Sequence, residues 1–332
     1  MARLGTWIEP KPNGLYVPAA DAWIDPSTPQ ERALVTHGHA DHARGGHGAV
    51  LATAETIAIM ETRYGPQNGQ PVAYGETTRV GEVDVKFVPA GHVLGSAQIV
   101  LMHKGERIVV SGDYKRRPDP TCAPFEPVPC DVFITEATFG LPVFRHPDTG
   151  SEIDRLLEAL HANPERCVLV GAYALGKAQR LIMELRGRAY HEPIFLHGAL
   201  QRLCDLYQEL GVDLGTLLPA TGRKAAEMKG AIVLCPPGAL NDRWSRRLPD
   251  PITAMASGWM GVRQRARQRN VELPLILSDH ADWDELTATI QELAPSEVWV
   301  THGREEALVH WCMTRQIKAR ALALAHYEDE DD

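Results

Sequence analysis

Short apolar runs separated by tight turns dominate the first part of the chain, up to about residue 145. Glycine and polar residues bound each run, and residues 104–106 form the kind of turn that joins two strands into a hairpin. Runs this short are typical of β-strands. They predict a mixed or antiparallel sheet, with strands at residues 33–36, 83–89, 98–103, 107–111 and 131–135.

The pattern changes near residue 150, where strand-like runs begin to alternate with amphipathic helical stretches. Residues 167–171 lead into a helix at 176–186, and residues 194–196 lead into a helix at 200–210. This alternation is typical of an open parallel sheet covered by helices. A similar order continues toward the C-terminus, with candidate elements at 273–277, 282–293, 298–301, 305–316 and 321–325.

These two patterns predict an α/β protein. A chain of 332 residues is long enough for two domains. The alternating stretch predicts a parallel, open-sheet domain, and the last residues, 328–332, form an acidic tail.

Composition narrows the class of protein. The chain has 44% hydrophobic and 23% charged residues, with no apolar stretch near the ~20 residues of a membrane helix and no secretory signal, so no membrane partner is expected. The net charge is −9, and the tail supplies five of those negative charges, so the total shows no strong general attraction to nucleic acid. The six cysteines are scattered without a CxxC pair, which predicts reduced thiols in a cytoplasmic protein.

One segment carries the clearest chemistry. Directly after the first of these apolar runs, residues 37–42 read His-Gly-His-Ala-Asp-His. Imidazole and carboxylate groups are ligands that suit zinc, iron and manganese. His37 and His39 alternate along extended backbone and can project to one side, while Asp41 and His42 follow as the chain leaves the strand. The segment predicts a metal site that can serve two adjacent ions; chance clustering of histidines is the alternative.

Four isolated polar residues share one position, because each of them follows an apolar run. They are His92, Asp113, His280 and His302. Enzymes with α/β folds place chemistry at strand ends, where the sheet fixes position and the loop stays accessible. Each residue alone has a simpler interpretation, a polar side chain that caps a strand. Together with residues 37–42, the four predict one constellation.

The order of these motifs resembles that of the metallo-β-lactamase superfamily. The resemblance rests on the His-x-His-x-Asp-His segment, on Gly-His at residues 91–92 and on Gly-Asp at residues 112–113. It implies the αββα sandwich of that superfamily, in which two sheets pack face to face between helices.

Further motifs narrow the resemblance to the β-CASP nucleases. Glu136, His280 and His302 are similar to motifs A, B and C of that family, and residues 172–179 resemble its Ala-Leu-Gly-Arg-Ala-Gln helix start. The compact length and residues 20–26 are most similar to the bacterial ligase-associated DNA exonucleases. The resemblance implies that the parallel α/β domain is a β-CASP domain, residues 146–255, inserted between the two parts of a metallo-β-lactamase domain, residues 1–145 and 256–327.

The resemblance also implies two divalent ions, zinc or manganese, that share one carboxylate. The first would be bound by His37, His39, His92 and Asp113, and the second by Asp41, His42, the shared Asp113 and His302. Asp25 would orient these ligands by hydrogen bonds, a role for which Asp21 competes.

In the mechanism that the resemblance implies, a hydroxide held by the two metals attacks phosphorus in line. His280 would protonate the leaving oxygen, and Glu136 would hold the other nitrogen of that ring. Asp41 is counted among the catalytic residues as well as the ligands. Candidates for contacts to the substrate backbone are Lys177, Arg180 and Arg243.

The implied function is a metal-dependent phosphodiesterase that acts on DNA, an exonuclease in DNA repair, with a DNA ligase or helicase as possible partner. An RNA-processing nuclease is the nearest alternative. His302 supports it, because the eukaryotic RNA-directed members that this chain resembles carry a histidine at motif C. A small-molecule metallohydrolase such as a lactonase, and a scaffold without activity, are further alternatives. The inserted domain and the complete ligand set argue against these two.

Overall fold

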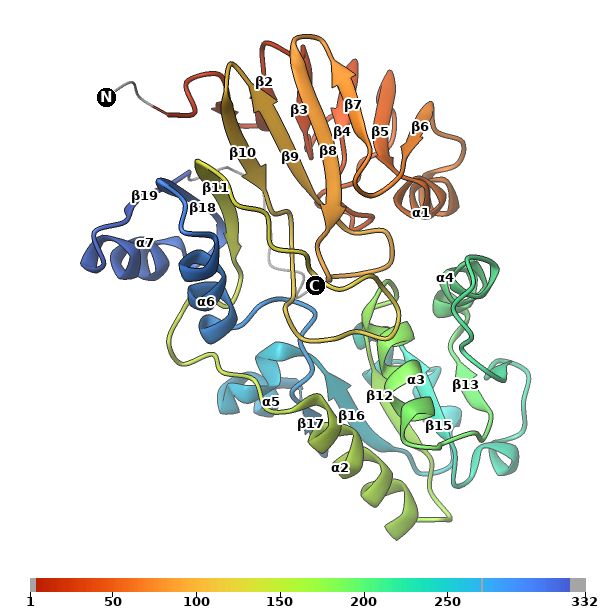
Figure 1. Ribbon diagram of the computed structural model, residues 1–332. Coiled ribbons are helices and arrows are strands. Elements are labelled where there is room, and N and C mark those ends of the chain that lie inside the picture. Colours follow the sequence, from red (N-terminus) through yellow and green to blue (C-terminus); the bar gives the residue numbers. More distant parts are fainter. Residues whose placement is uncertain (1–3, 270, 323–332) are drawn as a thin grey trace. The chain divides into compact units, whose positions relative to one another are not determined.

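The computed structural model describes residues 4–269 and 271–322, and within them the chain forms two compact units. Residues 4–145 and 280–322 form unit 1, and residues 146–279 form unit 2. Figure 1 traces helices and strands in both units, so the predicted α/β class is confirmed. The predicted acidic tail at 328–332 lies outside the described residues.

The first sheet of unit 1 runs in chain order from β1 to β6. Its first three strands pair antiparallel, whereas β3 to β6 pair parallel, and helix α1 (Ala54–Tyr64) follows β5. The strands are β1 (Glu9–Lys11), β2 (Gly14–Val17), β3 (Ala22–Ile24), β4 (Arg32–Leu34), β5 (Ala49–Thr53) and β6 (Gly69–Val72).

The second sheet of unit 1 has the order β19-β18-β11-β10-β9-β8-β7. Its strands from β7 to β10 form an antiparallel meander, and β10, β11, β18 and β19 pair parallel. Of the two predicted alternatives, mixed or antiparallel, the sheet is mixed, but the strand predicted at 33–36 belongs to the first sheet as β4. The strands are β7 (Thr77–Val80), β8 (Val83–Pro89), β9 (Ala97–His103), β10 (Glu106–Val110), β11 (Val132–Ala137), β18 (Glu297–Gly303) and β19 (Lys318–Ala321).

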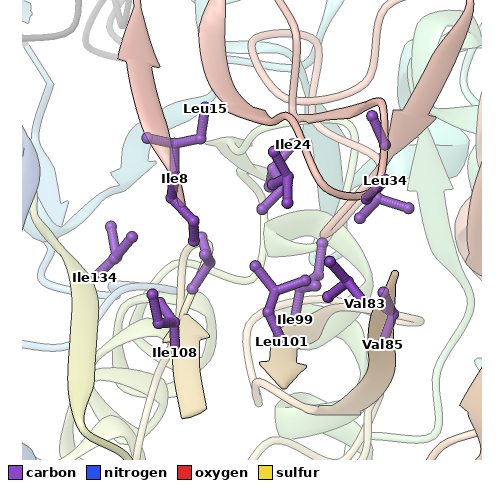
Figure 2. Packing of buried hydrophobic residues seen from close by; sticks show 14 of the residues in the cluster. Ile8, Leu15, Ile24, Leu34, Val83, Val85, Ile99, Leu101, Ile108 and Ile134 are labelled. Carbon is purple, nitrogen blue, oxygen red and sulfur yellow. The ribbon is translucent and has the colours of Figure 1, made fainter. Parts of the chain in front are cut away.

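The two sheets of unit 1 bury a common apolar core. Figure 2 shows Leu15, Ile24 and Leu34 from the first sheet in the same cluster as Ile99 and Ile108 from the second. Burying a side chain of this size stabilises the fold by about 1.5–3 kcal/mol. Alternate residues of the second sheet point the other way, because successive strand side chains face opposite sides.

Helices cover the outer faces of both sheets in unit 1. Helices α6 (Trp283–Leu293) and α7 (Glu305–Thr314) pack against the outer face of the second sheet, and α1 packs against the first. The order of layers is therefore helix, sheet, sheet, helix. Of the helices within 4–269 and 271–322, none has both the length and the apolar character that a membrane crossing demands.

Unit 2 contains a parallel sheet with the order β14-β13-β15-β12-β16-β17. Its elements are α2 (Thr149–Ala162), β12 (Val168–Gly171), α3 (Lys177–Gly187), β13 (Ile194–Leu196), α4 (Gly198–Glu209), β14 (Leu217–Pro219), β15 (Ile232–Cys235), β16 (Ile252–Ala256), α5 (Arg263–Arg269), β17 (Leu273–Leu275) and the 3₁₀ turns η1 (Ala225–Met228), η2 (Pro237–Asn241), η3 (Ser245–Arg247) and η4 (Gly258–Gly261).

The chain returns to unit 1 at His280, whereas the sequence pattern placed this return at residue 256. The difference arises because β17 pairs with β16 and so extends the sheet of unit 2. A short edge strand reads alike in either sheet, so periodicity alone could not assign it. Of the strand predicted at 321–325, Ala321 is the last residue of β19, and residues 323–325 lie outside the described residues.

Site residues lie at the ends of strands in unit 1, and backbone irregularities aim them. The β11–β18 ladder shifts register between Thr135 and Ala137, where β18 has one residue more than β11, and such bulges turn side chains away from their regular direction. Gly112, after β10, has φ +55° and lies so close to Thr36 that an added Cβ would be 2.7 Å from the Cβ of Thr36. This close approach joins the segment of Asp113 to the segment of His37.

The close approach at Gly112 predicts the effect of a methyl group there. We expect Gly112→Ala to lower the free energy of unfolding by about 2–4 kcal/mol, which combines left-handed strain with overpacking against Thr36. Gly105→Ala is the matched control, since Gly105 has φ +81° but open space around it. The control should lose only about 1 kcal/mol. Urea unfolding curves measure both, and equal losses would contradict the prediction.

Candidate metal centre

The first group of ligand atoms comes from His37, His39, His92 and Asp113, all of them buried. His39 Nδ1 lies 3.1 Å from His37 Nε2 and 2.9 Å from His92 Nε2. Asp113 Oδ2 lies 3.5 Å from His37 Nε2 and 3.8 Å from His92 Nε2. Edges of a zinc tetrahedron with N ligands are about 3.3 Å long. The four residues therefore fit a small divalent ion in size and in ligand type.

The proton arrangement around His37 also fits a metal. Thr36 Oγ1 donates to Asp25 Oδ2 at 2.6 Å, so it accepts from His37 Nδ1–H at 3.0 Å and leaves a lone pair on His37 Nε2. Burial and the neighbouring His42 lower the pKa of His37 well below its ordinary value, so this imidazole is neutral. Neutral ring nitrogens that face one another at contact distance are stabilised by a cation between them.

A second group consists of Asp41, His42 and His302. His42 Nε2 lies 3.5 Å from Asp41 Oδ2 and 3.4 Å from Asp113 Oδ2. The rings of His42 and His302 stack with centroids 4.9 Å apart. The backbone of His302 has φ +59° at the end of β18, which turns its ring toward His42.

Asp113 stands between the two groups. Its Oδ2 faces His37 in the first group and His42 in the second, while its Oδ1 is buried and has no hydrogen-bond partner in the described residues. A buried carboxylate oxygen without a partner is costly. A second cation beside Oδ1 would remove that cost, which suits a bridging carboxylate.

Asp25 orients ligands of both groups by hydrogen bonds. Its Oδ1 accepts from the Thr36 N–H at 2.8 Å, and its Oδ2 accepts from Thr36 Oγ1 and, at 2.8 Å, from His42 Nδ1. The His42 ring is thereby turned with Nε2 toward Asp113. Asp21, the competing candidate, lies at the surface and accepts a bond from the Tyr16 hydroxyl.

Charges in the group shift the pKa values in opposite directions. Burial disfavours the charged form of His42, but the carboxylates of Asp113 and Asp41 outweigh it and raise the pKa of His42 well above its ordinary value. Burial likewise opposes the Asp113 carboxylate, but His42 and His280 hold the pKa of Asp113 well below its ordinary value. Burial lowers the pKa of His302 to about 3. Without metal, the proton of the second group resides on His42.

His280 and Glu136 form a pair beside the shared carboxylate. His280 Nδ1 lies 3.0 Å from Glu136 Oε2 and 3.2 Å from Oε1, and 4.0 Å from Asp113 Oδ2. The Tyr114 N–H donates to Glu136 Oε1 at 2.8 Å and fixes that carboxylate. A carboxylate on Nδ1 stabilises the protonated ring and leaves Nε2 to donate.

The three predicted substrate contacts differ in their exposure to solvent. Lys177 and Arg180 are 4% and 1% exposed, and both bind the Asp279 carboxylate, at 2.7 and 3.2 Å. Inside unit 2 they neutralise a buried carboxylate, and their contact with substrate phosphates stays a prediction. Arg243 lies at the surface of unit 2.

Sequence reasoning missed Thr36 and Tyr114. Thr36 lies within a predicted strand, where a threonine gives no sign of a hydrogen bond to a buried aspartate. Tyr114 acts through its backbone N–H, which every residue except proline supplies. Neither contribution has a signal in the residue type.

Comparison with known proteins gives relatives that cover much of the chain; no protein-family profile matches. The chain is 31% identical over 317 residues to "Probable DNA ligase" of Opitutus terrae, which covers 93% of this chain and 30% of that protein. It is 29% identical over 217 residues to "Ribonuclease TTHA0252" of Thermus thermophilus, covering 54% of this chain and 49% of that protein. The chain thus spans half or less of the length of these relatives.

A solved structure supports the fold. The crystal structure of a protein of unknown function from Enterococcus faecalis matches with a TM-score of 0.55 and 14% sequence identity. The match covers 90% of this chain and 79% of that chain. At this level of identity the likeness concerns the fold alone.

The contacts of Asp25 predict a specific loss in Asp25→Asn. We expect the affinity for the second metal equivalent to fall about 10–100-fold, as is usual when a carboxylate that orients a ligand is removed. Metal analysis after equilibrium dialysis measures this. Asp21→Asn is the control, because Asp21 bonds only the Tyr16 hydroxyl in the contacts above. Equal metal affinity in the two variants would contradict the role of Asp25.

The raised pKa of His42 predicts proton release on metal binding. His42 is protonated at neutral pH in the metal-free protein, and coordination through Nε2 requires loss of that proton. Affinity of the second group should therefore rise with pH, about tenfold per unit below the pKa of His42. The neutral His37 adds no such dependence to the first group. Calorimetric titration in two buffers of different ionisation enthalpy counts the protons, and a second equivalent that releases none would contradict this assignment.

Proposed function

Because the chain belongs to the metallo-β-lactamase β-CASP nuclease family, we propose that it is a metal-dependent hydrolase of phosphodiester bonds that acts on DNA, as an exonuclease in DNA repair. The observation that carries the proposal is the pair of ligand groups that share Asp113, next to the Glu136–His280 pair. We assign unit 1 to the metallo-β-lactamase domain and unit 2 to the inserted β-CASP domain.

The ligand groups suit two ions, zinc or manganese, with His37, His39, His92 and Asp113 around one and Asp41, His42, Asp113 and His302 around the other. Such ions supply an activated water and offset the charge of the phosphate. The protein's own residues hold and orient the ligands. Asp113 holds both groups together, and Asp25 fixes the direction of His42 and, through Thr36, of His37.

His280 is the proton donor in this proposal. Its Nδ1 faces Glu136, so Nε2 is the nitrogen that can protonate the leaving oxygen. Glu136 stabilises the imidazolium before transfer, and the Tyr114 N–H keeps Glu136 in place. Asp41, only partly buried, lies at the accessible side of the second group, where we count it with the catalytic residues.

One of the two relatives supports DNA as the substrate. The relative that matches 93% of this chain is named as a DNA ligase, and this also supports a ligase as functional partner. A cytoplasmic site of action agrees with the six cysteines, all of which are free thiols. RNA is the second candidate substrate, because another relative is named as a ribonuclease and because His302 is present.

The experiment is digestion of end-labelled DNA and RNA, single- and double-stranded, by metal-free protein with zinc or manganese added back. We expect mononucleotides from DNA and none from the metal-free protein. His280→Ala should keep its metal but lose about 10²–10⁴-fold in rate. Products from RNA alone would contradict the proposed substrate. Loss of metal in His280→Ala would make His280 a ligand and contradict its role as proton donor.

A further inference from the structure

His280 lies in an irregular segment, two residues before the N-cap of α6. Its ring contacts Glu136, but no helix or strand holds its backbone. The next residue, Ala281, donates its N–H to the Tyr114 carbonyl at 2.7 Å, and Asp282 is the N-cap of α6. The position of the His280 ring therefore depends on how firmly Ala281 and Asp282 are held.

A capping box starts α6 and places two carboxylates side by side. Asp282 Oδ1 accepts from the Glu285 N–H at 3.0 Å, and Glu285 Oε2 accepts from the Asp282 N–H at 3.2 Å. Each carboxylate keeps one further oxygen. Burial has the largest effect on the pKa of Glu285 and raises it. Arg117 lowers this pKa and Asp282 raises it, and the net result is a raised pKa. Two carboxylates this close repel each other, and a cation beside both offsets that repulsion.

Arg117 provides that cation with the matching geometry. Its Nη2 donates to Asp282 Oδ2 at 2.6 Å, and its Nε lies 3.2 Å from Glu285 Oε1. The Asp282 side chain is 2% exposed and that of Arg117 is 30% exposed, so one end of the contact is interior. A planar guanidinium can bind two carboxylates at once, whereas a lysine ammonium lacks this fork.

The loop that carries Arg117 also carries the shared ligand. Asp113, Tyr114 and Arg117 lie within five consecutive residues. Asp113 belongs to both ligand groups, and the backbone of Tyr114 contacts Glu136 and Ala281. Arg117 contacts the capping box. One short loop thus sets the relative positions of the shared carboxylate, the Glu136 carboxylate and the start of α6. Arg117 closes the last of these contacts.

We propose that Arg117 is a positioning residue for the reaction, which fixes His280 by clamping the capping box of α6 and makes no contact with the substrate. The inference rests on the proposed function, because it needs His280 to be the proton donor. An arginine so close to a metal ligand invites assignment to a substrate phosphate. Its two carboxylate partners on α6 favour the positioning role.

The chain offers a matched control in the adjacent residue. Arg116 also binds α6, through Thr289 Oγ1 at 2.9 Å and Glu292 Oε2 at 2.7 Å, but both contacts lie beyond the capping box. Arg116→Gln and Arg117→Gln remove the same charge and a similar tie to α6. Only Arg117→Gln removes a contact with the capping box beside His280.

The experiment compares both variants on a labelled DNA strand and on bis(p-nitrophenyl) phosphate, whose nitrophenolate leaves without protonation. For Arg117→Gln we expect kcat on the strand to fall about tenfold or more, with KM, metal content and activity on the nitrophenyl ester unchanged. The limb of its pH profile that reports the proton donor should shift. Arg116→Gln should stay within about twofold on both substrates. Asp282→Asn should reproduce the pattern of Arg117→Gln.

Several outcomes would overturn the proposal. A raised KM for the strand with unchanged kcat and a weaker salt dependence would make Arg117 a phosphate contact. Equal losses on both substrates, or equal effects of the two variants, would exclude a role through His280. If Arg117→Gln does not fold, as judged by thermal unfolding, Arg117→Lys keeps the charge without the fork and should show the same selective loss. Failure of the proposed function is distinct, because the metal-loaded wild-type protein itself would then leave the DNA strand uncleaved.

Discussion

The Asp113 carboxylate lies in the protein interior, with Oδ2 within 4.0 Å of ring nitrogens of four histidines. An isolated charge in such a place costs several kcal/mol, so the carboxylate is tolerable only where cations or hydrogen-bond donors surround it. The four histidines come from three separate parts of the chain. The need to compensate one buried charge therefore dictates that these parts meet, and the two sheets of unit 1 supply the frame on which they do.

The two sheets achieve this with ordinary apolar packing and a small number of irregular residues. Leucine, isoleucine and valine side chains between the sheets fix the strands, as in any layered fold. Departures from regularity are concentrated at strand ends, at Gly112, at the bulge beside Glu136 and at the left-handed His302. The core thus keeps the strands rigid, and the irregular residues at the strand ends determine the direction in which individual side chains point.

The sequence predicted the class of fold, the mixed sheet and the residues that converge, because strand periodicity and the spacing of His37 to His42 are local signals. It did not predict which sheet takes the strand Leu273–Leu275, since partner choice depends on distant residues. Nor did it predict that Lys177 and Arg180, the candidates for substrate contacts, both pair with Asp279. A positive charge looks alike in sequence whether it faces solvent or a buried carboxylate. Contacts made by backbone groups, such as the Tyr114 N–H, leave no trace in the sequence.

The insertion of unit 2 between β11 and the segment of His280 has a consequence for the nascent chain. Translation proceeds from the N-terminus, and domains tend to fold as they emerge. The first part of unit 1 carries His37, His39, His92 and Asp113, and so can assemble one half of the centre early. His280 and His302 appear only after all of unit 2 has been synthesised. A ribosome-bound or truncated chain would therefore carry the ligands of the first group yet lack the proposed proton donor, so we expect hydrolytic activity only after unit 2 has been synthesised.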